Sequence, residues 1–165
     1  MAQLTYPQDL VNAFEGMLAD TGMRNDVLSR VGEEAVSFPH GVALVAGTDP
    51  DKQVLLPTGA AKLVGVAVHS HANEVGADDL NLVDQGRYVG ALHVGRIYVK
   101  VEEAVTPASP VFVRTAAGGG GSQLGAFRAS GDTATALAAS GARFITSGAG
   151  GSLVVLEIDA DAAIA

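Results

Sequence analysis

His69 and His71 are the residues of this chain whose type and spacing come closest to a chemical site. Side chains two residues apart on a strand point to the same face of a sheet, so the two imidazoles could share one metal ion. Of the four histidines in the chain, His69 and His71 are the two that lie close together in sequence, and they are therefore the candidate metal ligands.

Glu74 follows this pair, and a glycine, an H-x-H run and a glutamate occur in that order in the cupin metal enzymes, which this stretch resembles. The spacing departs from the cupin pattern, because Gly65 is too close before His69 and Glu74 is one residue too close after His71. We find no second motif that would supply the usual later histidine. We therefore predict no metal site and interpret the two histidines as solvated residues at a strand end, with a metal-binding cupin-like enzyme as an alternative.

Other catalytic motifs are missing from the linear sequence. Asp78, Asp79 and Asp84 do not form the regular run of oxygen ligands that a calcium loop requires. The glycine tracts at 118–121 and 148–151 lack the Gly-Lys-Ser/Thr of a phosphate-binding loop, and no G-x-S-x-G segment marks a nucleophile. We predict that the protein is not an enzyme, with no catalytic residues and no cofactor.

Composition narrows the remaining classes of function. The 165 residues fit one domain, and the absence of cysteine excludes disulfides and thiolate metal sites. Ten Lys and Arg against eighteen Asp and Glu give a net charge of −8, without a basic cluster for phosphates, so we expect no direct contact with nucleic acid. The sequence has no signal peptide pattern and no apolar run of membrane-spanning length, which predicts a protein made in the cytoplasm without a membrane partner.

Short strands dominate the hydrophobic pattern. Alternation is clearest where Ile97, Val99 and Val101 are separated by Tyr98 and Lys100. Similar short apolar runs, bounded by glycine, proline and aspartate, predict eight or nine strands, and only 130–140 offers an alternative small helix or loop. The expected fold class is mainly β, an antiparallel β-sandwich or jelly-roll-like barrel with a short N-terminal helix or arm. The strand segments lie at 35–45, 62–71, 88–101, 110–115, 125–129, 143–147 and 152–158.

The N-terminal segment is ambiguous between a helix and an extended arm. Apolar residues at helical spacing favour a helix over 5–20, whereas Pro7 would suit either a first helical turn or an extended arm, and Gly16 weakens the helical pattern. We predict an arm or short helix over 1–34 that packs on a single β-domain over 35–165, with a flexible glycine-rich loop at 118–122.

Four blocks, read in order, resemble one known family. They are FEGMLAD at 14–20, GVALVAGTD at 41–49, LVGVAVHSH at 63–71 and GRIYVKVEEAV at 95–105, followed by a glycine-rich hairpin and LVVLEI. Their order is similar to that of the structural cement proteins of tailed phages, small β-proteins that decorate the capsid.

The resemblance implies a structural protein on the outer surface of the phage head that bridges neighbouring major capsid subunits and stabilises the shell. The implied partners are the major capsid protein and further copies of the chain itself, as a homodimer or homotrimer. A phage tail or baseplate binding module is the other alternative. Leu4, Tyr6, Leu10 and Phe14 are the expected partner-contact residues, although they could equally cover the core of their own domain.

Overall fold

The computed structural model describes residues 13–20, 24–70, 82–117 and 122–165, and these ranges contain eleven strands and no helix. No described helix is therefore available to cross a membrane. The mainly β expectation is confirmed. The strands are β1 (Asp26–Gly32), β2 (Phe38–Pro39), β3 (Ala43–Ala46), β4 (Gln53–Leu55), β5 (Ala61–Val68), β6 (Leu82–Val83), β7 (Tyr88–Lys100), β8 (Phe112–Arg114), β9 (Phe127–Arg128), β10 (Ala136–Phe144) and β11 (Leu153–Ile164).

One half of the molecule is a small closed barrel. Its strands follow the order β1-β4-β3-β5-β7, and pairing of β1 with β7 closes the circuit. All of these pairings are antiparallel except that of β1 with β4. The β2–β6 pair covers the barrel, and its core is built around Phe38, Leu44 and Val54.

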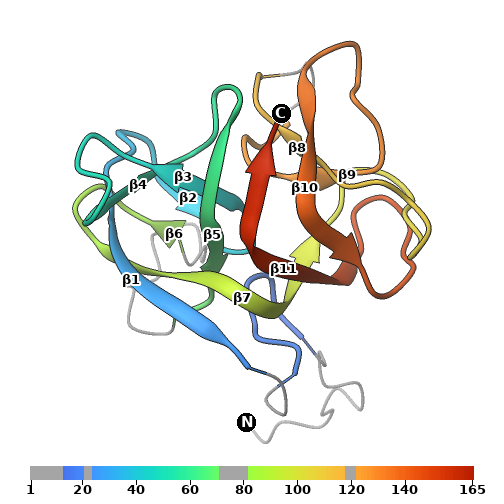
Figure 1. Ribbon diagram of the computed structural model, residues 1–165, viewed down its shortest axis with the longest axis horizontal. Helices are drawn as coiled ribbons and strands as arrows, with labels where there is room; N and C mark the ends of the chain where they lie inside the picture. The colour runs from blue at the N-terminus through green and yellow to red at the C-terminus, as the bar shows by residue number, and fades with distance from the viewer. Residues whose placement is uncertain (1–12, 21–23, 71–81, 118–121) are drawn as a thin grey trace, which may run out of the picture.

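The other half forms around the second part of β7. Gly95, with φ of 137°, is where β7 leaves β1 and β5 and takes β11 as its partner, and β7 runs through this glycine as one continuous strand. The order continues through β10, β8 and β9, and a bridge from Phe127 to Val101 returns the circuit to β7. Figure 1 shows β5, β7 and β11 between the two halves.

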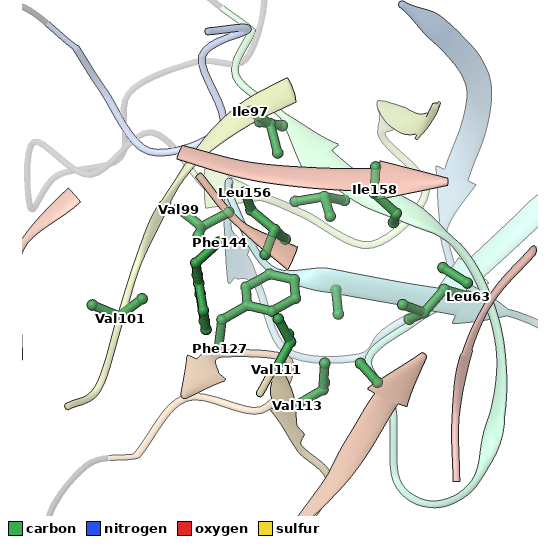
Figure 2. Close-up of a cluster of buried hydrophobic side chains, with 14 of the residues drawn as sticks. Leu63, Ile97, Val99, Val101, Val111, Val113, Phe127, Phe144, Leu156 and Ile158 are labelled. Atoms are coloured by element: carbon green, nitrogen blue, oxygen red, sulfur yellow. The ribbon is translucent and has the colours of Figure 1, made fainter. Parts of the chain in front are cut away.

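Each half has its own apolar core, and the two cores lie on opposite faces of the same central strands. Phe127, Phe144 and Leu156 point toward one another in the core of the second half (Figure 2). On β3, Ala43 and Val45 face this core, whereas Leu44 faces the barrel core. Because strand side chains alternate between faces, β3 is a wall buried on both sides.

Of the two alternatives predicted for the N-terminal segment, a helix or an extended arm, the helix is wrong over 13–20. Residues 13–20 are not helical, because Gly16 adopts φ of 78° and the chain then runs beside β7, with Leu18 opposite Ile97. Residues 1–12 lie outside the described part of the chain. Residues 26–32, within the predicted arm, form β1 and pair with both β7 and β4.

The alternative of a small helix or loop over 130–140 is also wrong over 136–140, which belong to β10. Of the alanines that suggested a helix, Ala136, Ala138 and Ala139 lie in β10, and Ala136 and Ala139 are buried. Gly141, with φ of 71°, lies where a Cβ would come within 2.8 Å of the Ala162 Cα. The expected hairpin around Gly148–Gly151 is present, since Phe144 pairs with Leu156 across it.

Candidate functional site

Backbone hydrogen bonds hold the 14–19 segment across two strands of the fold. Gly16 donates to the Tyr98 carbonyl at 2.8 Å, and Tyr98 donates back to the Met17 carbonyl at 2.8 Å. On the other side, the His69 N–H donates to the Gly16 carbonyl at 2.7 Å. This short segment therefore connects the C-terminal part of β7 to the end of β5 and presents its side chains from a fixed backbone.

The segment carries an exposed apolar patch, which we define as Phe14 and Met17. The Phe14 side chain is 49% exposed and Met17 is 41% exposed. The Phe14 ring stacks on the His69 imidazole with 5.6 Å between centroids, and His69 in turn contacts the buried His40 ring at 5.0 Å. A stacked aromatic ring that remains half exposed is suited to contact a partner.

A groove lies beside this patch. Its larger part has a volume of about 780 Å³ and is lined by residues that include Glu15, His40, Lys100, Glu102 and Arg114. A smaller part of about 420 Å³ reaches Phe14 and His69. Lys100 and Glu15 form an ion pair of 3.5 Å in this region, so the groove has both apolar and charged walls.

Two arginines and three carboxylates form a charged cluster at one wall of the groove. Arg114 Nε and Nη2 each donate to Glu102 at 2.7 Å, and Arg128 Nη1 reaches the same carboxylate at 3.1 Å. Asp132 Oδ2 accepts from both guanidinium groups at 2.8 Å. Glu103 accepts from Arg128 Nε at 3.2 Å and from the Ala129 N–H at 2.9 Å.

This cluster is an internal clamp rather than a binding site for anions. The carboxylates outnumber the guanidinium groups by three to two, and both arginines are buried. Hydrogen bonds from Arg114 and Thr135 hold the pKa of Asp132 below its usual range. Burial opposes a low pKa at Glu103, but bonds from Ser130 and Ala129 outweigh it and lower that pKa. The clamp fixes β8, β9 and the 130–135 turn to the end of β7.

The clamp also holds an unusual backbone. Asp132, Thr133 and Ala134 all have positive φ, at 41°, 55° and 68°, although none is a glycine. Such conformations persist only where surrounding contacts enforce them. Here Asp132 binds both arginines, and Thr135 Oγ1 donates to the Asp132 carbonyl at 2.8 Å.

Of the candidate partner contacts and histidine ligands, the described residues include Phe14 and His69, and the structure brings these two together. Phe14, an expected partner contact, stacks on His69, a candidate metal ligand, so His69 is packed on an aromatic ring rather than simply solvated. Leu4, Tyr6, Leu10 and His71, with Glu74, lie outside the described residues. Within the described ranges, no group of three or more His, Asp or Glu is arranged to hold a metal ion.

Sequence reasoning missed His40 and the charged clamp. His40 is distant from His69 in the chain, and the two meet because β3 pairs with β5. The GRIYVKVEEAV block contains Glu102 and Glu103, but no spacing rule connects them to arginines brought close by the second half of the fold. Glu157 likewise forms ion pairs on β11 with Arg96 and Arg143, which lie on the neighbouring strands β7 and β10.

The described residues form a small, mainly β domain whose buried arginines are paired with carboxylates and whose exposed apolar residues include Phe14 and Met17. The chain belongs to the structural cement protein family of phages. The family model, described as Structural cement protein (E217 gp24/Pam3 gp6), matches residues 2–159. The resemblance read from the four sequence blocks is thereby confirmed, and the protein is a structural component of the phage capsid.

A solved structure has the same fold. A chain in "The capsid of Myoviridae Phage XM1" superposes with a TM-score of 0.72 at 14% identity, covering 97% of this chain and 98% of that chain. A comparison with curated proteins gave no match.

Proposed function

We propose that this protein is a non-enzymatic cement protein that binds the outside of the phage head and bridges neighbouring major capsid subunits. It does so as a homodimer or homotrimer and as a single β-domain. The observation that carries the proposal is the family match over residues 2–159. Attachment of this kind needs contacts of only moderate affinity. When each oligomer binds the shell through more than one copy, the linked contacts give a higher overall affinity than any single contact.

The Phe14–Met17 patch is the surface we assign to the capsid contact. It combines exposed apolar area with a backbone fixed by hydrogen bonds to β7 and β5, so little conformational entropy is lost on binding. The adjoining groove offers the Lys100–Glu15 pair as a polar rim. An aromatic residue on a rigid support beside a polar rim is the arrangement expected of an interface hot spot.

The test is cosedimentation of the purified protein with heads stripped of accessory proteins and with unexpanded procapsids, quantified as copies per shell. Saturable binding to expanded heads, at a copy number tied to that of the major capsid protein, is expected. Binding to neither shell would contradict the proposal and favour a tail or baseplate role.

The variant Phe14→Ser tests the assigned surface, with Tyr88→Ser as its matched control. Tyr88 is 76% exposed and lies at the opposite end of β7, so its loss removes exposed aromatic area without altering the patch. Truncation of an interface hot spot costs at least about 2 kcal/mol, or roughly thirtyfold in affinity. Equal binding of the two variants to heads would show that Phe14 is not part of the capsid contact.

A further inference from the structure

One edge of β1 is open within the described part of the chain. β7 pairs with β1 along one edge from Asp26 to Val31, whereas β4 reaches the other edge only at Val31 and Gly32. Backbone bonds from Val31 to Lys52 and from Glu33 to Val54 mark where β4 contributes. Along 26–30, no described strand occupies the second edge. An open, partly apolar strand edge is a template for a further strand.

The hydrogen-bond pattern shows which backbone groups face this edge. The Val31 N–H points away from β7, since it donates to Lys52, and strand residues alternate in direction. The N–H and C=O groups of Val27 and Ser29 therefore also point outward. The Ser29 carbonyl is contacted there by the Arg30 Nη1 of its own chain at 3.0 Å, which places the guanidinium group at the open edge.

The sequence of this edge is complementary to itself. If two copies of β1 pair antiparallel about a two-fold axis at Leu28, Val27 faces Ser29 of the second copy, and their outward groups match as donors and acceptors. The same register sets Asp26 opposite Arg30. Within the described residues Arg30 makes no ion pair and its buried Nε has no hydrogen-bond acceptor, whereas Asp26 forms an exposed pair with Arg24 at 3.5 Å, which the dimer would exchange for Arg30.

Neighbouring registers are poorer. Shifting the axis to Val27 sets Arg24 opposite Arg30, two like charges. Shifting it to Ser29 leaves Asp26 opposite Gly32, without an ion pair. Registers whose two-fold axis lies between two residues are excluded. They would place a residue whose N–H and C=O point outward opposite one whose N–H and C=O face β7. The register centred on Leu28 is the one that joins opposite charges.

We infer that this protein forms a two-fold dimer by antiparallel pairing of β1 with β1 of a second copy, centred on Leu28. The exposed Val27 side chain, 41% accessible in the single chain, becomes covered in this dimer. The inference deepens the proposed function, on which its biological role rests, by selecting a dimer and naming its interface. Two capsid-binding patches are then held on one rigid unit.

The chain has no cysteine, so a single introduced thiol reports the register directly. In the predicted dimer the two Leu28 Cα atoms face each other at about 4.5 Å, within the range that a disulfide spans. In either neighbouring register they are diagonal and about 7 to 8 Å apart, beyond that range. Leu28→Cys is therefore expected to form a covalent dimer under mild oxidation, and the matched control Arg30→Cys is not.

Sedimentation equilibrium gives the oligomeric state without a crosslink. The wild type is expected at twice the chain mass of 16.6 kDa. Asp26→Arg or Arg30→Asp alone should weaken the dimer about tenfold or more, and the double variant should restore it. Ser29→Pro should give a folded monomer, because the N–H it removes makes no bond to β7.

Circular dichroism and urea unfolding of each variant separate loss of the dimer from loss of the fold. A monomeric or trimeric wild type, or a dimer indifferent to Ser29→Pro with no Leu28→Cys crosslink, would overturn the inference. Cosedimentation with heads is measured on the same samples. Saturable head binding without β1 pairing would refute only the dimer, whereas a dimer that binds no shell would refute only the capsid role.

Discussion

Arg114 donates from Nε and Nη2 to the two carboxylate oxygens of Glu102 at 2.7 Å each, and so fastens β8 to the chain just after β7. Arg114 is only 4% exposed, and the buried guanidinium is balanced by Glu102 together with Asp132. This pair closes the second half of the molecule, where β8 and β9 have short ladders of their own.

Arg114→Met should therefore destabilise the protein strongly. The substitution leaves Arg128 as the remaining arginine partner of Glu102 and Asp132, and removing one partner of a buried ion pair costs up to about 3 to 5 kcal/mol. Urea unfolding followed by circular dichroism measures the loss. Lys52→Met, which removes the exposed pair with Asp49, is the matched control and should change stability by about 1 kcal/mol or less. A similar effect of both substitutions would show that the clamp contributes little.

Acid should destabilise the protein through the clamp and through β11. The pKa of Asp132 is lowered by Arg114 and Thr135, and the pKa of Glu157 is lowered by hydrogen bonds from Arg96 and Arg143 against burial. A carboxyl whose folded pKa lies below its unfolded value of about 4 stabilises the fold above that value. This stability is lost as the pH falls through the folded pKa, because the unfolded chain then binds more protons.

The urea midpoint is accordingly expected to stay level from neutral pH to about pH 5 and to fall steeply below about pH 4. Asp132→Asn should flatten part of this decline, since it removes one of the responsible carboxyls. A midpoint that rises on acidification would contradict the assignment of these groups.

Gly16→Ala should loosen the 14–19 segment. Gly16 has φ of 78°, and a Cβ there would lie 2.7 Å from both the Ala67 carbonyl oxygen and the His40 Cβ. Gly86 has nearly the same φ, 76°, with nothing within 4 Å of a Cβ. Gly86→Ala measures the conformational cost alone and should lower the free energy of unfolding by about 1 kcal/mol. Gly16→Ala should lower it by at least about 2 kcal/mol more, because the added Cβ also meets close neighbours. Thermal unfolding of the two variants makes the comparison, and equal losses would contradict the close packing.

Gly65→Ala tests the approach of β5 to β7. An added Cβ would lie 2.4 Å from the Leu92 carbonyl oxygen, a backbone atom that moves only with its strand. The expected loss is about 1 to 3 kcal/mol, as for other insertions into packed sites. Gly59→Ala, where the space is open, should be neutral or slightly stabilising. Tolerance of both changes in urea unfolding would mean that β5 and β7 can separate at this point.

Local periodicity predicted much of the fold but not its closure. Ile97, Val99 and Val101 are buried on the side that the alternation indicates, because the period of two survives any tertiary context. The strand over 136–140 was missed because alanine favours helices intrinsically, whereas here pairing with β8 and β11 makes these residues a strand. Such a requirement depends on neighbours distant in sequence.

The candidate site was predictable to a similar extent. Phe14 stood out as an apolar residue in an ambiguous segment, and it is half exposed, while its role as a partner contact stays a prediction. Its stacking on His69 could not be predicted, because it depends on Gly16 bonding to Tyr98 and His69 at once. The ion pairs of Glu102 likewise need β7, β8 and β9 to be in place first.

The wall formed by β3, with Leu44 in one core and Ala43 and Val45 in the other, has a mechanical consequence. Neither core can open without uncovering apolar area that belongs to the other, so the two halves unfold in one cooperative transition. Because β7 pairs with both β1 and β11, we expect a force applied at β1 to reach β11 through one continuous strand, so that the molecule acts as a stiff spacer.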